Sequence, residues 1–165
     1  MKATTLLEKQ HTKAKAALKK LMKAYDEAVL DQLASELAAH MVIEETIFYP
    51  AVRKVMPDLV AEAYEEHALA QVALQRLLRT DANDERFEAR ATALFDLLDH
   101  HIDEEQDELF PKVNKALPDA QLKELGADME TAFDELVARG HRKVLSQTMG
   151  ETTADASSAN TAAAR

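Results

Sequence analysis

Two stretches of the chain decide the fold: HMVIEETIFYPAVRKVMPD at residues 40–58 and HIDEEQDELFPKVNKALPD at residues 101–119. A shift of 61 positions places His40 on His101 and Glu44 on Glu105, and it keeps two prolines, a valine, a lysine and an aspartate in register. The two stretches are therefore copies of one unit.

The repeat extends to the segment that precedes each copy. A shift of 56 positions places His11 on His67. Each half of the chain is thus predicted to be a helical hairpin with one His on its first helix and a His and a Glu on its second. This pseudo-symmetry favours two bound metals over one.

Hydrophobic periodicity indicates where the helices lie. Apolar residues recur at alternating spacings of three and four, which predicts helices at about residues 4–25, 30–51, 60–78 and 87–109. The repeated His and Glu residues fall on these apolar stripes, and Ile47 and Ala51 continue the second stripe inward. A shorter fifth helix is predicted at about 119–139, packed across the bundle, with Gly140 near its end.

Composition agrees with an all-α protein, because helix-favouring residues dominate and only 3 glycines and 4 prolines occur among 165 residues. We expect an up-down-up-down four-helix bundle with a short fifth C-terminal helix. One domain is predicted at residues 1–145, followed by a disordered tail at 146–165, which is small and polar.

Charge and residue content exclude several classes of function. A net charge of −10 disfavours nucleic acid and anionic membranes as partners. The chain has no cysteine, so His and carboxylate are its only strong metal ligands. We find no signal-peptide core and no membrane-spanning segment, and we expect a cytoplasmic protein that acts as a monomer or weak dimer.

The polar residues on the stripes point to metal binding. A single His on an apolar stripe is more often a satisfied core residue than a ligand. Burial of four imidazoles and two carboxylates without a cation, however, costs several kcal/mol per uncompensated charge. We therefore predict that six residues bind metal: His11, His40, Glu44, His67, His101 and Glu105.

These residues resemble the hemerythrin-like HHE cation-binding domains, whose pattern is a His, a His-x-x-x-Glu, a His and a second His-x-x-x-Glu. The resemblance covers about residues 4–115 and includes FYP, LFP and EEH beside the predicted ligands. It implies a non-haem di-iron centre, two Fe ions with an oxo or hydroxo bridge, that meets small molecules such as O2, H2O2 or NO.

One position departs from the family's oxygen carriers. In the oxygen-carrying hemerythrins, the resemblance implies a fifth His one turn after the third-helix ligand. This chain has Gln71 at that position. The missing imidazole should leave an open or water-filled position on one iron, which favours reaction over reversible storage of O2. Peroxide decomposition in oxidative-stress defence, a catalase-like di-iron activity, is the reaction we expect first.

Several residues near the predicted ligands are candidates for supporting roles. Tyr64 and Gln71 are candidates for hydrogen bonds to ligands or to a bound oxygen species, and Tyr49 follows the second-helix ligands. Each is also compatible with ordinary packing. Glu45 and Glu104 are expected on a solvated acidic face, and His141 is expected to be exposed.

Three alternatives remain open on the sequence alone. The first is reversible binding or sensing of O2 or NO. The second is iron handling of the ferritin type, although that class uses a Glu-x-x-His spacing that this chain lacks. The third is a structural bundle or a zinc-binding module.

Overall fold

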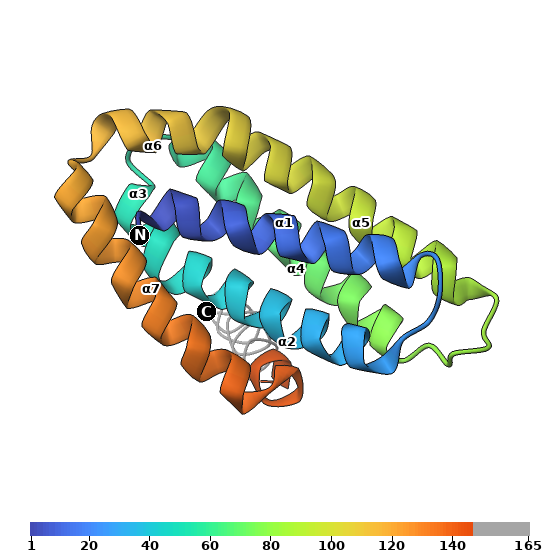
Figure 1. Ribbon diagram of the computed structural model, residues 1–165. Helices are drawn as coiled ribbons and strands as arrows, with labels where there is room; N and C mark the ends of the chain where they lie inside the picture. Colours follow the sequence, from blue (N-terminus) through green and yellow to red (C-terminus); the bar gives the residue numbers. More distant parts are fainter. Residues whose placement is uncertain (147–165) are drawn as a thin grey trace, which may run out of the picture.

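Four long helices enclose the centre of the computed structural model, which describes residues 1–146. They are α1 (Ala3–Leu21), α2 (Glu27–Ile43), α4 (Pro57–Leu78) and α5 (Arg86–Glu104). Helices α2 and α5 each contact both α1 and α4, so the four close into a ring whose members run alternately up and down (Figure 1). The described residues contain no strand, which confirms the all-α prediction. The predicted tail lies outside them, apart from Ser146.

A fifth helix, α7 (Asp119–Arg139), lies against α1 and α2 (Figure 1). Its bounds agree with the predicted ones, but at 21 residues it is as long as the bundle helices. Gly126 allows the close approach to α1, because a Cβ at this position would lie 2.4 Å from the backbone oxygen of Met1. Helix α7 is therefore an integral layer of the fold.

Each His-x-x-x-Glu helix widens at its Glu into one turn of π-helix. These turns are η1 (Glu44–Phe48) and η2 (Glu105–Leu109), and the short helices α3 (Tyr49–Val52) and α6 (Phe110–Ala116) follow them. The amide of Tyr49 donates to the carbonyl of Glu44, and that of Phe110 donates to Glu105, five residues back in each case. Both turns stand just before a proline, which cannot donate to the helical ladder and crowds the preceding turn.

The π turn η1 corrects the predicted second stripe. One extra residue in the turn rotates the following side chains by about 100°. Phe48 and Val52 are consequently buried, whereas Ile47 is only half-buried and Ala51 is exposed. In the second repeat unit, Leu109 is buried, as predicted from the fourth apolar stripe.

Two further predictions were wrong: that the first helix extends to residue 25, and that His141 is exposed. Helix α1 ends at Leu21, because Asp26 caps the next helix by accepting a hydrogen bond from the amide of Val29, which leaves residues 22–26 as a connection. His141 is buried, because Gly140 adopts a positive φ of 78° and the chain folds back against α2. The ring of His141 lies 3.4 Å from the hydroxyl of Ser35.

The apolar interior consists of two clusters with the predicted ligands between them. One cluster includes Leu18, Leu37 and Leu74, and the other includes Leu7 and Phe110. Along α1, α2, α4 and α5 the buried His residues fall where one cluster gives way to the other. Within residues 1–146, no helix is long and apolar enough to span a lipid bilayer.

Candidate metal centre

The structure brings all six predicted ligands into one buried layer of the bundle. His11 comes from α1, His67 from α4, and the two His–Glu pairs from α2 with η1 and from α5 with η2. None of the six is more than 5% exposed. Helical spacing explains the pairs, because residues four apart lie one above the other on the same face.

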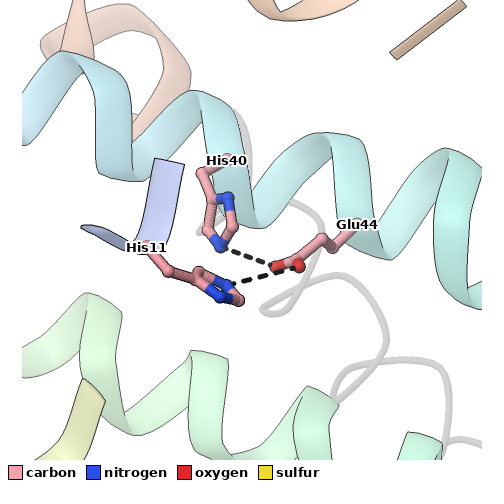
Figure 2. Close-up of side chains that lie close together, drawn as sticks. All are labelled: His11, His40 and Glu44. Atoms are coloured by element: carbon pink, nitrogen blue, oxygen red, sulfur yellow. Dashed lines mark ion pairs between the residues drawn. The ribbon is translucent and has the colours of Figure 1, made fainter. Parts of the chain in front are cut away.

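One group of three ligands contains His11, His40 and Glu44 (Figure 2). The Nε2 atom of His40 lies 3.0 Å from Glu44 Oε2, and that of His11 lies 4.0 Å from Glu44 Oε1. The rings of His11 and His40 meet edge to face at 4.8 Å. Figure 2 shows the two imidazoles, which come from different helices, pointing toward the same carboxylate.

A second group of three shares the same carboxylate and contains Glu44, His67 and His101. His67 Nε2 lies 3.3 Å from Glu44 Oε2 and 3.1 Å from His101 Nε2. Glu105 stands beside both groups, because its Oε2 atom lies 3.3 Å from His11 Nε2 and 3.6 Å from His101 Nε2. Two groups of imidazoles thus face a pair of central carboxylates.

The hydrogen bonding within this layer is incomplete in a way that suits cations. Among the described residues, the buried side-chain atoms without a hydrogen-bond partner all belong to this layer or adjoin it: Gln10 Nε2, His11 Nε2, both Oε atoms of Glu44, and Glu105 Oε2. Buried carboxylate oxygens without donors are costly unless a cation neutralises them. The donor set of imidazole nitrogen and carboxylate oxygen fits a divalent transition metal.

Burial also shifts the protonation of these groups. It lowers the pKa of His11 to about 4. It raises the pKa of Glu105 to about 7, with a further contribution from the neighbouring charge of Glu44. Burial alone would lower the pKa of His67, but Glu44 and Glu45 reverse this effect and raise it to about 10. Strong shifts in opposite directions are typical of functional sites.

Carboxylates hold the outer ring nitrogens of two of the histidines. His67 Nδ1 lies 3.0 Å from Glu45 Oε1, and His101 Nδ1 lies 2.8 Å from Glu66 Oε2. A proton on Nδ1 leaves the Nε2 lone pair directed at the centre, which is the arrangement of a metal-binding imidazole. The expectation that Glu45 lies on a solvated acidic face was wrong, since it is 23% exposed and holds His67.

Amides hold the outer nitrogens of the other two histidines. His40 Nδ1 lies 2.8 Å from Gln10 Oε1, and His11 Nδ1 lies 3.0 Å from the amide nitrogen of Gln106. Every predicted His ligand thus has a polar side chain behind it. These partners were missed because each stands directly beside a ligand in the sequence and points about 100° away from the stripe.

The two tyrosines near the centre lie in different places relative to the predicted ligands. The hydroxyl of Tyr64 donates to the backbone oxygen of Glu45 and does not bond to a predicted ligand, because the ring is 37% exposed at the edge of the bundle. Tyr49 is fully buried, and its hydroxyl donates to Glu105 Oε1 at 2.9 Å. Gln71 is half-buried on α4, one turn beyond His67, and its role stays a prediction.

A surface cluster of His and Glu side chains adjoins the site. It consists of Glu66, His100 and Glu104, and the side chain of His100 is 65% exposed. His100 therefore faces solvent while its neighbour His101 faces the centre.

A cavity of about 230 Å³ connects the imidazoles to the face formed by α1, α2 and α7. Its walls include His11, His40, His67 and His101 together with apolar side chains such as Leu37 and Leu98. Its rim includes exposed charged residues on α1 and α7, such as Lys9 and Glu130. The cavity therefore lies between exposed residues of α1 and α7 and the buried imidazoles.

Fold and site together define a helical bundle whose buried His and Glu side chains are grouped as those of a metal site are. The chain matches the Hemerythrin HHE cation binding domain over residues 2–113, and it belongs to that family. Helix α7 lies beyond the matched segment.

Similar proteins agree with this assignment. The uncharacterized protein Rv2633c of Mycobacterium tuberculosis is 27% identical over 142 residues, which cover 82% of this chain and 88% of that protein. An uncharacterized hemerythrin-like protein of Schizosaccharomyces pombe is 29% identical over 74% of this chain and 64% of its own length. The crystal structure of an HHE cation binding domain-containing protein from Mycobacterium kansasii, an Rv2633c homologue, superposes with a TM-score of 0.75 at 28% identity, covering 88% of this chain and 97% of that one.

Proposed function

We propose that this protein holds a non-haem di-iron centre and uses it to decompose hydrogen peroxide. The observation that carries the proposal is the pair of three-residue groups, His11–His40–Glu44 and Glu44–His67–His101, which share one buried carboxylate that lacks hydrogen-bond donors. A shared carboxylate between two imidazole pairs suits two metals held close together. His and Glu ligands without cysteine are compatible with iron.

The cavity supports a substrate of a few atoms. Its volume of about 230 Å³ is below the range of about 300–1,000 Å³ that is usual for organic ligands. A water molecule occupies about 30 Å³ of liquid, so H2O2, O2 or NO fits beside the imidazoles. This size argues against an organic substrate at the centre.

Peroxide disproportionation balances with two electrons per step. One H2O2 takes up two electrons and two protons to give two H2O, and a second H2O2 returns two electrons and two protons to give O2. A bound iron pair, held by the six predicted ligands, would supply this two-electron chemistry. The protein orients the imidazoles through their Nδ1 partners, and Tyr49 holds Glu105 in place by donating its hydroxyl hydrogen.

Reversible binding of O2 or NO is the second candidate, and Gln71 is the residue that separates the two. It occupies the position one turn after His67 where the oxygen carriers of this family have a further His ligand. An amide there does not supply that imidazole nitrogen, so we rank reaction above storage.

The test begins with iron supplied to the metal-free protein without oxygen. We expect about two irons per chain, as in other bundle sites of this kind, and O2 evolution from H2O2 well above that of free iron. His101→Ala should lose iron, whereas the control His100→Ala, one residue away on the exposed face, should keep it. Iron binding without O2 evolution would favour O2 or NO binding, and binding of zinc alone would refute redox chemistry.

A further inference from the structure

The two halves of the centre differ in the charge of the side chains behind the histidines. We call the site of His67 and His101 the carboxylate-backed position, because Glu45 and Glu66 hold their Nδ1 atoms. The site of His11 and His40 is the amide-backed position, because glutamine side chains hold theirs. The predicted ligands are of the same residue types in both halves, so the two positions differ in the side chains around the ligands.

This difference follows the internal repeat. The shifts of 56 and 61 that relate the ligands also relate the partners, so equivalent places carry different chemistry. In all three equivalent pairs the more polar or charged member stands at the carboxylate-backed position. The pairs are Gln10 with Glu66, Gln106 with Glu45, and Phe110 with Tyr49.

The aromatic pair shows the same asymmetry. Phe110 stacks on His11 with ring centres 5.9 Å apart and offers no polar atom. Tyr49 packs on His67 at 5.5 Å and places its hydroxyl between His67 Nε2, 3.3 Å away, and Glu105 Oε1. The surroundings of His67 are thus consistently more polar than those of His11.

A carboxylate partner affects a metal ligand in two ways that an amide does not. It only accepts hydrogen bonds, so it holds the proton on Nδ1 and keeps Nε2 free, whereas an amide can serve either tautomer. It also adds a negative charge that attracts a cation. Glu45 and Glu66 are only 23% and 17% exposed, so solvent screens this attraction in part. Both effects strengthen metal binding at the carboxylate-backed position.

We propose that the two metal positions are unequal, and that Glu45 and Glu66 act as positioning residues that make the carboxylate-backed position bind metal more tightly and fill first. This inference rests on the two-metal centre of the proposed function. It goes beyond that function because it assigns an order of loading and two residues that determine it.

The test uses Co²⁺, which needs no redox step to bind and reports its ligands by visible absorption. The metal-free full-length chain is titrated with Co²⁺ in the absence of oxygen, and binding is followed by calorimetry and absorption. We expect two steps, the first at least about tenfold tighter, since partners behind a ligand typically change metal affinity by about 10- to 100-fold. Two Co²⁺ ions bound with equal affinity would overturn the inference alone, and no binding would refute the proposed function as well.

Paired substitutions then locate the difference. In E45Q/E66Q both positions are amide-backed, so the first step should weaken about 10- to 100-fold while the second stays unchanged. In the reciprocal variant Q10E/Q106E the second step should strengthen while the first is kept. These changes preserve side-chain shape, and circular dichroism of the metal-free variants checks the fold. An unchanged gap between the two steps in either folded variant contradicts the proposal.

Discussion

His100 and His101 show how one step along a helix changes the role of a side chain. Consecutive residues on a helix point about 100° apart. His101 is buried among the other imidazoles, and the side chain of His100 is 65% exposed. The same step separates Glu44, at the centre, from Glu45, which holds a histidine from behind. Ligand and partner are therefore encoded as neighbours in the sequence.

The buried hydroxyl of Tyr49 gives a prediction at this scale. Tyr49→Phe leaves Glu105 Oε1 without its donor, and loss of a buried hydrogen-bond partner costs about 1–3 kcal/mol. We expect the metal-free variant to lose that much free energy of unfolding in urea denaturation. Tyr64→Phe is the matched control, because its hydroxyl lies at the exposed edge, and it should change stability by less than about 0.5 kcal/mol. Equal losses in the two variants would contradict this role of Tyr49.

At the scale of elements, the π turns place the aromatic residues beside the centre. The extra residue in η1 and η2 turns Tyr49 and Phe110 inward, where they pack on His67 and His11. A regular α-helix through these segments would place a different residue at each of these contacts. In both halves of the repeat, a π turn thus places an aromatic residue against a buried His.

The approach of α7 to the N-terminus gives a second prediction. Gly126→Ala should destabilise the protein by about 1–3 kcal/mol, because the new Cβ would overlap the backbone of Met1 and Ala3. In an unhindered helix the same change stabilises by about 1 kcal/mol. The control Ala127→Gly, at an exposed position of α7, should cost about 1 kcal/mol through helix propensity alone. Thermal unfolding of both variants measures the difference, and a stabilised Gly126→Ala would exclude the close approach.

Much of this arrangement was predictable from the sequence, and the exceptions have physical causes. Periodicity and the repeat predicted the all-α bundle and the bounds of α7, since both depend on spacing along the chain. They missed both π turns, η1 and η2, because a regular period cannot represent an extra residue in a helical turn. Pro50 and Pro111 follow the two turns at equivalent places. The residues that hold the Nδ1 atoms could not be predicted, because their contacts depend on how the helices are rotated against one another. The repeat does relate these residues in pairs, such as Gln10 and Glu66.

At the scale of the whole molecule, the centre lies between two apolar clusters, and its side chains come from all four helices of the bundle. Within the described residues its carboxylates have fewer hydrogen-bond donors than burial requires. A bound cation would link helices that are far apart in the sequence. The stability of the whole bundle should therefore depend on metal.

Removal of metal tests this dependence. A metal present at about one hundred times its dissociation constant adds about 2.7 kcal/mol to the free energy of unfolding, which corresponds to a rise in Tm of roughly 5–10 °C for a chain of this size. We expect scanning calorimetry to show that rise with Co²⁺ or anaerobic Fe²⁺. Mg²⁺ at the same concentration is the control, because it prefers oxygen ligands. Equal Tm values with Co²⁺ and Mg²⁺ would argue against a structural contribution of the centre.

The presence of both hairpins in one chain has a genetic consequence. A single hairpin carries one His and one His–Glu pair. Two identical hairpins on separate chains would therefore supply the same set of predicted ligands, but the side chains around the ligands would then be identical in both halves. Any mutation in such a dimer would change both halves at once. Covalent fusion removes this constraint, since Glu45 and Gln106 occupy equivalent places but belong to separate codons. The two halves of this centre can therefore be changed independently, one codon at a time, by evolution or by design.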